Sequence, residues 1–257
     1  MKKKYDMIVL GGNGFFGSEL VKFYKNNNLK VLNINSKNYK LLKGSKSKII
    51  INANGNSYRY KANKNPKWDF KKSYLSVCKS VHDFNYDLYI YISSVDVYDV
   101  KNNKKKNSEN KTINPLKIDF YAFHKWISEK YIEKYTKNYL IFRLGTLIGP
   151  DMKKGPLIDI IKNRSAFMSL NSKLTMISKS TAVKMINKIV QLKITNQIFN
   201  ITCSNNFLLK DLKKKYNDIR VFNNKKYDYN INVSKINKYY NVPKSSFEVK
   251  KLINFLR

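Results

Sequence analysis

Short apolar runs alternate with amphipathic stretches along roughly the first two thirds of the chain. Such runs are typical of strands that are buried on both faces of a parallel sheet. We expect these strands at residues 7–10, 29–34, 49–51, 88–92, 140–144 and 198–201. Apolar positions at helical spacing predict helices at residues 18–24, 70–84, 121–135 and 180–192. The alternation of strand and helix predicts an α/β protein with a doubly wound parallel sheet.

The pattern loosens after Gly145, where Gly149-Pro150 and Gly155-Pro156 predict a loop. Residues 101–111 are rich in Lys and Asn and are interpreted as a solvated loop. We therefore expect two regions, a core and a small C-terminal lobe. The core would comprise residues 1–145, with residues 180–203 returning to it, and the lobe residues 146–179 and 204–257.

The formal net charge of +34 raises the possibility of a nucleic-acid binder. Of the 51 basic residues, however, 46 are Lys and only five are Arg, and the chain also holds 34 Asn. Lys, Asn, Ile and Tyr are favoured by AT-rich codons, so codon bias accounts for this profile. Arg, the better reader of bases and phosphates, is scarce. We therefore expect no specific nucleic-acid partner.

The remaining composition indicates a protein of a reducing compartment. Cys78 and Cys203 are far apart and form no CxxC pattern, so we expect reduced thiols and a cytoplasmic location. No apolar run reaches the 18 residues of a membrane span, so we expect no membrane association. His82 and His124 are isolated in the sequence, so we expect no metal site. His124 is interpreted as a helix-surface residue.

A glycine-rich loop follows the first predicted strand at once. It has the pattern GxxGxxG, and its candidate binding residues are Gly11, Asn13, Gly14, Phe15, Phe16 and Gly17. In this pattern the first glycine permits a tight turn and the second lets backbone N–H groups approach a pyrophosphate. The third lets the following helix pack closely on the strand. The context of strand, loop, helix and strand predicts a dinucleotide site rather than a merely structural turn.

The residues after the second predicted strand bear on the choice of dinucleotide. A carboxylate at this place would bind the ribose hydroxyls of NAD. The chain has instead Asn33, Asn35, Ser36 and Lys37, with no acid nearby. A 2′-phosphate would be tolerated there, and Ser36 and Lys37 are candidates to bind it. This favours NADP, with NAD as the alternative, although Lys37 is also one of many lysines.

Three further residues carry candidate acid–base chemistry. Tyr121 and Lys125 stand four apart on a predicted helix and so share one face. A lysine ammonium close to a phenol favours the phenolate, so we expect it to lower the pKa of Tyr121 from about 10. Ser94 lies at the carboxyl end of a predicted parallel strand, where α/β sheets place their ligands. Its hydroxyl could hold a substrate carbonyl.

Taken in order along the chain, these motifs resemble those of the extended short-chain dehydrogenase/reductases. This is the NAD(P)-dependent epimerase/dehydratase family, which acts mostly on nucleotide sugars. The resemblance covers residues 5 to about 203. Besides the glycine loop it rests on Asn-Ala-Asn-Gly at 52–55, Tyr-Ile-Ser-Ser-Val-Asp-Val-Tyr at 91–98, Tyr-Ala-Phe-His-Lys at 121–125 and the segment 142–150.

The resemblance implies a Rossmann-like fold and roles for particular residues. Tyr121 would be the acid/base, Ser94 its catalytic partner, and Lys125 would also bind the nicotinamide ribose. Ala53, Asn54 and Gly55 would line the cofactor, together with the glycine loop. Glu129 fits the acid that often follows the family's lysine by four residues. The C-terminal lobe would bind a nucleotide-sugar substrate, and the resemblance allows a homodimer.

Departures from the family pattern narrow the expected reaction. Few residues separate Ser36 from Ile49, so we expect the third strand and its helix to be short. This form is similar to 4-keto-sugar reductases such as dTDP-4-dehydrorhamnose reductase. Asp99 stands where the family usually has Gly, and Val95-Asp96 lacks the paired acids typical of dehydratases. We expect reduction of a 4-keto sugar, with epimerisation as the alternative.

An alternative of another class is a nucleic-acid-binding or regulatory protein that reuses the fold. The observation in its favour is the net charge. The presence of Ser94, Tyr121 and Lys125 counts against it, because a binding module has no use for all three.

Overall fold

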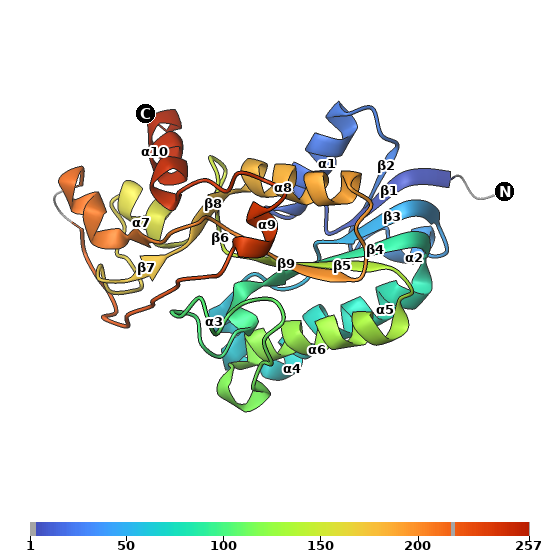
Figure 1. Ribbon diagram of the computed structural model, residues 1–257, viewed down its shortest axis with the longest axis horizontal. Helices are drawn as coiled ribbons and strands as arrows, with labels where there is room; N and C mark the ends of the chain where they lie inside the picture. Colours follow the sequence, from blue (N-terminus) through green and yellow to red (C-terminus); the bar gives the residue numbers. More distant parts are fainter. Residues whose placement is uncertain (1–3, 217–218, 257) are drawn as a thin grey trace. The chain divides into compact units, whose positions relative to one another are not determined.

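A six-stranded sheet forms the centre of the N-terminal part of the chain. The computed structural model describes residues 4–216 and 219–256 and divides into two compact units (Figure 1). Unit 1 comprises residues 1–99, 112–144 and 186–199, and unit 2 comprises residues 100–111, 145–185 and 200–257.

The order of the strands makes the sheet doubly wound. The strands are β1 (Lys4–Leu10), β2 (Val31–Ile34), β3 (Lys46–Asn52), β4 (Asn85–Ser94), β5 (Tyr139–Leu144) and β9 (Gln197–Ile201). They lie in the order β2-β1-β3-β4-β5-β9, and the pairs from β2 through to β5 are parallel. The chain therefore moves outward from β1 in one direction and then in the other. This confirms the predicted Rossmann-like fold, whose ligands bind where the strand order reverses.

Helices cover the sheet on both faces. In Figure 1, α1 (Gly17–Asn26) and the end of α8 (Lys179–Gln191) lie on one face, and α5 (Leu75–Asp83) and α6 (Phe120–Tyr135) lie on the other. Short elements connect them. These are α2 (Tyr39–Leu42), α3 (Arg59–Lys64), α4 (Pro66–Asp69), the π-helical turn η1 (Phe70–Tyr74) and the 3-10 turns η2 (Val95–Val97) and η3 (Pro115–Lys117).

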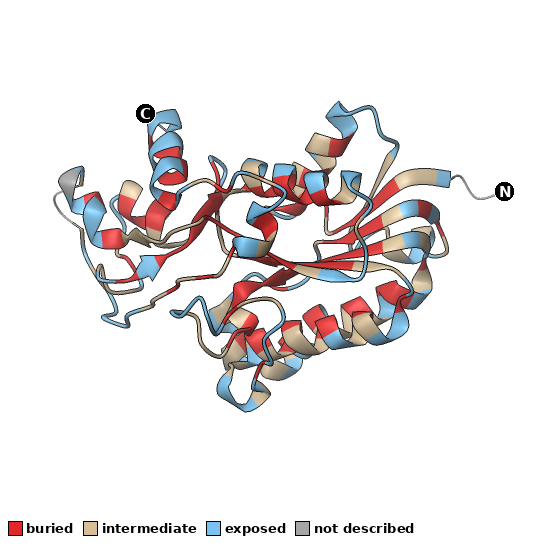
Figure 2. Cartoon of the chain, in the orientation of Figure 1, coloured by how far each residue is buried: buried red, intermediate tan, exposed pale blue. Residues whose placement is uncertain are grey.

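The buried residues of unit 1 follow the sheet (Figure 2). Strands β1, β3, β4 and β5 supply Ile8, Ile50, Tyr89 and Ile141, all wholly buried, and α6 adds Ile132. Because both faces of the sheet are covered, the strand centres are continuous apolar runs, as the sequence indicated.

The predicted strands and helices of unit 1 are present, with two differences. The third strand was expected to be short, and this is wrong: β3 has seven residues, and only its helix α2 is short, with four. The helix expected at residues 70–84 is present, but its first turn η1 is π-helical and continues directly into α5, and α4 comes immediately before it.

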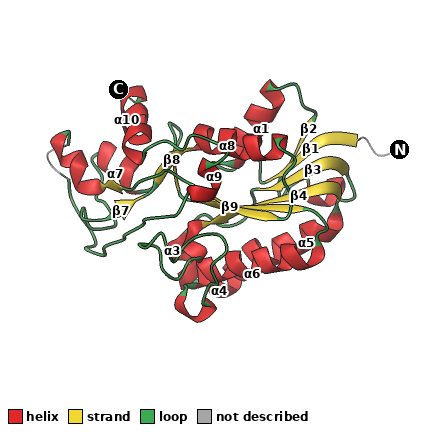
Figure 3. Ribbon diagram, in the orientation of Figure 1, coloured by secondary structure: helices red, strands yellow, loops and turns green. Residues whose placement is uncertain are grey.

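Unit 2 is built from short elements (Figure 3). They are β6 (Thr146–Ile148), β7 (Lys173–Leu174), β8 (Met176–Ser178), β10 (Phe207–Leu208), α7 (Pro156–Ile161), the 3-10 segment η4 (Leu209–Lys214), α9 (Ser234–Asn237) and α10 (Ser245–Phe255). β6 pairs with β8 and β7 with β10. No helix in the described ranges is both long and apolar enough to cross a membrane.

The basic segment at residues 101–111 makes hydrogen bonds to residues 200–232, and Asn107 lies at their centre. Asn107 is wholly buried, and its side-chain amide donates to the carbonyl oxygens of Lys101 (3.1 Å) and Asn230 (2.9 Å). Its side-chain oxygen accepts a hydrogen bond from the backbone N–H of Asn232 at 2.8 Å. Most of the segment is exposed, as expected for a solvated loop, but this asparagine ties it into unit 2.

A buried ion pair joins α6 to the sheet. The Glu129 carboxylate accepts two hydrogen bonds from Arg143 of β5, from Nη2 at 2.7 Å and from Nε at 3.1 Å. The exposed fractions of the two side chains are 0% and 2%. Ser93 Oγ donates to the same carboxylate at 2.5 Å, and the Arg143 guanidinium lies 4.8 Å from the centre of the Tyr98 ring. The pair therefore fixes helix α6 against β4 and β5.

We expect Glu129→Gln to lower the free energy of unfolding by about 3–5 kcal/mol, because it leaves the Arg143 charge buried without its partner. The matched control is Glu133→Gln on the same helix, whose exposed ion pair with Lys130 contributes about 1 kcal/mol or less. Urea denaturation of both variants measures the difference. A loss for Glu129→Gln no larger than that of the control would show that the buried pair is not holding the helix.

Candidate active site

The glycine loop brings the ends of three strands together. Leu10, Ile34 and Asn52 are in register at the carboxyl edge of the sheet. Gly11 continues β1 with a φ of +78°, and its N–H donates to the carbonyl oxygen of Ile34 at 2.8 Å. A Cβ on Gly11 would lie 2.9 Å from the Cα of Asn54. Only glycine fits this position, because both the backbone conformation and the close approach exclude a side chain.

The start of α1 is equally close to the loop. A Cβ on Gly17 would collide with the carbonyl oxygen of Gly11 and lie 2.8 Å from its carbonyl carbon. Gly14 N–H donates to the same oxygen at 2.9 Å, which closes the turn. The positive end of the α1 dipole is thereby held at the carboxyl edge of the sheet, where it favours a phosphate. These contacts show why the loop needs glycine at both positions, as the GxxGxxG pattern indicates.

The turn after β2 contains no carboxylate. Asn35 Oδ1 accepts from the backbone N–H of Lys37 at 2.9 Å, and Asn35 N–H donates to Asn38 Oδ1 at 2.8 Å. Ser36 and Lys37 are exposed beside it. Further back, Asn33 Nδ2 donates to Asn13 Oδ1 at 2.7 Å, which links this strand to the glycine loop. The turn is ordered by neutral amides and carries one lysine.

The residues after β3 lie along the same edge. Ala53 N–H donates to the carbonyl oxygen of Leu10 at 3.0 Å, and Asn54 N–H donates to Asn52 Oδ1 at 2.9 Å. A Cβ on Gly55 would lie 3.6 Å from the Lys125 ammonium nitrogen. The segment Ala53–Gly55 therefore connects the glycine loop to the candidate acid–base residues.

The structure brings Ser94, Tyr121 and Lys125 to one edge of the sheet. Ser94 ends β4, where its Oγ accepts from the Asp96 N–H at 3.1 Å, and Tyr121 lies in the first turn of α6, close enough to Ser94 for the serine to favour the phenolate. Lys125, one turn further on, donates from Nζ to the carbonyl oxygen of Ile92 at 2.9 Å. Its Nζ also lies 4.9 Å from the centre of the Tyr91 ring.

The protonation state of Tyr121 differs from the sequence-based expectation. Burial raises the pKa of Tyr121, and the negative charge of Asp96 raises it further, and together they outweigh the opposite effect of the nearby Ser94. The expectation that Lys125 lowers this pKa is wrong, because desolvation of the phenolate is the larger effect. Tyr121 therefore keeps its proton at neutral pH and is placed to act as an acid.

The ammonium of Lys125 is also desolvated. Burial lowers the pKa of Lys125 to about 8, against the opposing negative charges of Asp69 and Glu129. Lys125 is therefore mostly charged at pH 7, and it loses its charge as the pH rises through about 8.

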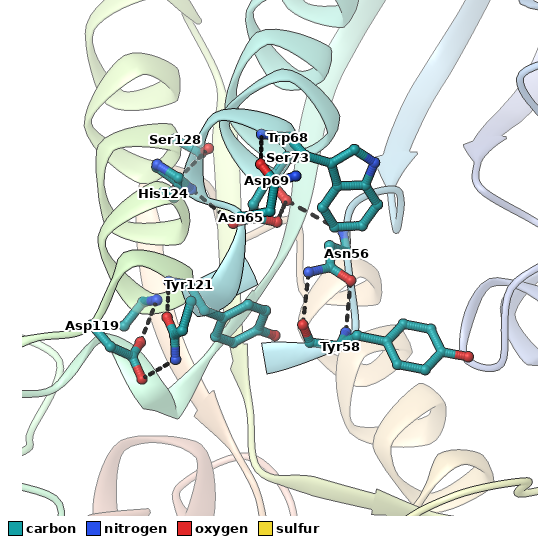
Figure 4. A network of polar contacts seen from close by, with 12 residues as sticks. Asn56, Tyr58, Asn65, Trp68, Asp69, Ser73, Asp119, Tyr121, His124 and Ser128 are labelled. Atoms are coloured by element: carbon teal, nitrogen blue, oxygen red, sulfur yellow. Dashed lines mark hydrogen bonds and ion pairs between the residues drawn. The ribbon is translucent and has the colours of Figure 1, made fainter. Parts of the chain in front are cut away.

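An arginine connects the segments that carry Ser94 and Tyr121. Arg59 of α3 contacts Asp96, close to Ser94, at 3.1 Å and Asp119 at 2.6 Å. Asp119 is the N-cap of α6, and Asn63 Oδ1 accepts from the Tyr121 N–H at 3.1 Å (Figure 4). Sequence analysis missed Arg59, since nothing local marks it apart from the scarcity of arginine.

His124 was interpreted as a helix-surface residue, and this is wrong. Its side chain is buried and its Nδ1 lies 2.7 Å from Oδ2 of Asp69 (Figure 4). Asp69 was also missed by sequence analysis. The two residues are 55 positions apart, so no local pattern links them.

Comparisons with known proteins agree with this geometry. The family model of the NAD dependent epimerase/dehydratase family matches residues 7–184. No curated protein sequence matches the chain.

Solved structures share the whole fold at low sequence identity. A UDP-galactose 4-epimerase superposes with a TM-score of 0.80 at 18% identity, over 99% of this chain and 98% of its own. A dTDP-4-dehydrorhamnose reductase of Bacillus anthracis in complex with NADP gives 0.79 at 14% identity, over 99% of each chain. A UDP-glucuronic acid 4-epimerase of Bacillus cereus, in complex with UDP-glucuronic acid and NAD, gives 0.75 at 17% identity, over 99% of this chain and 100% of its own.

The family model spans well over half of the chain and includes the glycine loop, Ser94, Tyr121 and Lys125. The doubly wound sheet and the glycine loop described above are the structural features that such a match requires. On this evidence the chain belongs to the NAD dependent epimerase/dehydratase family.

Proposed function

We propose that the protein is an NADP-dependent reductase that converts a 4-keto nucleotide sugar into the corresponding alcohol. The observation that carries the proposal is the Tyr121 side chain, which lies in the first turn of α6 beside Ser94 and whose pKa is raised by burial and by Asp96. A phenol that keeps its proton at neutral pH is suited to donate it to a carbonyl oxygen.

Each residue has a distinct part in this reaction. Bound NADPH would supply a hydride to the carbonyl carbon. Tyr121 donates its phenolic proton to the carbonyl oxygen, so the ketone becomes an alcohol. Ser94 donates a hydrogen bond to the same oxygen and holds it in place. Lys125 stabilises the phenolate that Tyr121 becomes and would bind the nicotinamide ribose.

The main alternative is epimerisation of a nucleotide sugar by the same residues. An epimerase must first remove a proton from a substrate hydroxyl, for which a phenolate is the useful form. The raised pKa of Tyr121 keeps the phenol protonated, which is the form in which a reduction begins. The turn after β2 also favours NADP, since Asn35, Ser36 and Lys37 offer no carboxylate to repel a 2′-phosphate.

The first test is a fluorescence titration of the protein with NADPH and with NADH at physiological salt, followed by NADPH oxidation with 4-keto nucleotide sugars. Tight binding of NADPH with much weaker binding of NADH supports the proposal. A preference for NADH, or NAD that remains bound through purification, would favour epimerisation. Failure to bind either cofactor would contradict both assignments.

We expect Tyr121→Phe to reduce turnover by a factor of roughly 10²–10⁴, because it removes the proton donor and leaves the ring in place. The Kd for NADPH should change by no more than about twofold, because the glycine loop is untouched. Tyr131→Phe on the same helix, which removes a hydroxyl bonded to His82, is the control. Turnover by Tyr121→Phe at the rate of this control would show that another group donates the proton.

We expect Asn35→Asp to weaken NADPH binding by roughly tenfold or more and to improve NADH binding, because the new carboxylate repels a 2′-phosphate and accepts from ribose hydroxyls. Asn28→Asp, in the turn before β2 at the opposite edge of the sheet, adds the same charge away from the site. Fluorescence titration of both variants gives the ratio of the two affinities. An unchanged ratio in Asn35→Asp would mean that this turn does not contact the ribose.

A further inference from the structure

Asp69 is a wholly buried carboxylate at the junction of α4 and η1. Its exposed fraction is 0%, and that of the His124 side chain is 5%. Asp69 Oδ2 accepts from His124 Nδ1 at 2.7 Å and Oδ1 accepts from Ser73 Oγ at 2.8 Å (Figure 4). Asn56 lies close enough to favour the carboxylate form of Asp69. Because a carboxylate can only accept, Nδ1 of His124 carries the proton in this contact.

The hydrogen bonds lower the pKa of Asp69 even though burial opposes them. Asp69 is therefore ionised at neutral pH. A buried charge of this kind is costly unless it is fully hydrogen-bonded, and Asp69 has partners on both of its oxygens. The cost of burying it is a reason to ask what the charge does.

The network reaches the site from two sides. On one side His124 immediately precedes Lys125 on α6, so the contact with Asp69 fixes the turn of helix that carries the lysine. On the other side Ser73 Oγ accepts from the Asn56 N–H at 3.3 Å, and a Cβ on Gly55 would lie 3.7 Å from Ser73 Oγ. Asp69 is thus bonded directly to His124 on α6 and, through Ser73, to the segment that contains Gly55, and these two segments meet at the Lys125 ammonium.

The polar, aromatic and charged groups that act on Lys125 come from several elements. β4 supplies the Ile92 carbonyl oxygen and the Tyr91 ring. Two negative charges favour the ammonium form of Lys125, those of Asp69 and of Glu129 on α6. The effect of Asp69 on the pKa of Lys125 is the larger of the two.

These two carboxylates differ in their partners. The charge of Glu129 is matched by Arg143 in the buried ion pair described above. Tyr121, on the same helix as Lys125, keeps its proton and contributes no charge at neutral pH. Asp69 is hydrogen-bonded to His124 and Ser73, and its charge raises the pKa of Lys125 more than that of Glu129 does.

We propose that the buried Asp69–His124 pair is the positioning unit of the active site, which orients Lys125 and supplies the negative charge opposite its ammonium. The proposal rests on the proposed function for the reaction that Lys125 serves. The effect of the Asp69 charge on Lys125 involves only residues of this chain, so it is tested without any substrate.

The decisive variant is Asp69→Asn, which keeps the shape of the side chain and removes its charge. We expect the titration midpoint of Lys125 to fall by about one pH unit, because a nearby carboxylate shifts a pKa by that order. The midpoint is measured from the ¹³Cε resonance of Lys125 in lysine-labelled protein, which is assigned by its loss in Lys125→Met. In the same variant the alkaline limb of the pH profile of kcat/KM should move down by the same amount.

The matched control is Asp83→Asn. Asp83 lies at the end of α5 and is bonded to Tyr39 at 3.0 Å and to Lys43 at 2.8 Å, and neither partner belongs to the site. It should leave both the Lys125 midpoint and the alkaline limb unchanged. A general effect of removing a carboxylate from this basic chain would move the midpoint equally in both variants and would overturn the proposal.

A second pair of variants tests the positioning role if Asp69→Asn does not fold. His124→Asn keeps an N–H that can donate to Asp69, whereas His124→Ala removes it. We expect His124→Ala to lower kcat by roughly tenfold or more, through displacement of Lys125, and His124→Asn to restore most of the loss. Equal kcat values for the two variants would overturn the positioning role.

The outcomes separate this inference from the proposed function. Wild-type protein that binds neither NADPH nor NADH would contradict the proposed function, while the Lys125 titration would still decide the role of Asp69. Normal cofactor binding together with an unchanged Lys125 midpoint in Asp69→Asn would overturn this inference and leave the proposed function standing.

Discussion

Helix α6 carries three buried side chains that can bear a charge, and each requires a partner from another element. His124 is matched by Asp69 of α4, Lys125 by the Ile92 carbonyl oxygen of β4, and Glu129 by Arg143 of β5. Burying a charge is costly unless it is paired or hydrogen-bonded, so these contacts restrict α6 to one position against the sheet. The place of Tyr121 beside Ser94 depends on that restriction, because Tyr121 lies on the first turn of the same helix.

The scarcity of acidic residues makes their placement informative. Against 51 basic residues the chain has 17 acidic ones, and many of them form ion pairs. Asp96 and Asp119 bind Arg59, and Asp69 binds His124. Asp96 follows Ser94 by two residues, Asp119 caps α6, and Asp69 contacts α6 through His124. The surface lysines have few possible partners of this kind, so their large number says little about the site.

Local patterns predicted most of the sheet and the cofactor loop, because both depend on residues that are near in sequence. A buried strand is an apolar run, and the loop from Gly11 to Gly17 has glycines where the backbone turns and where the helix packs on it. The positions of Ser94, Tyr121 and Lys125 could be named because the family resemblance supplied their roles. The surroundings of these residues could not, because Arg59 and Asp69 reach them from segments that are distant in sequence. The direction of the Tyr121 pKa depends on burial, which spacing along a helix does not reveal.

The chain passes from one compact unit to the other five times, at residues 99, 111, 144, 185 and 199. Each unit is therefore assembled from three separate stretches of sequence. During synthesis the sheet of unit 1 lacks its edge strand β9 until residues 197–201 have left the ribosome, and unit 2 lacks α10 until residues 245–255 have done so. Contacts between distant segments form late and slowly, so the nascent chain exposes apolar strand edges for most of its synthesis. Neither unit corresponds to a continuous piece of the chain that could be produced by itself.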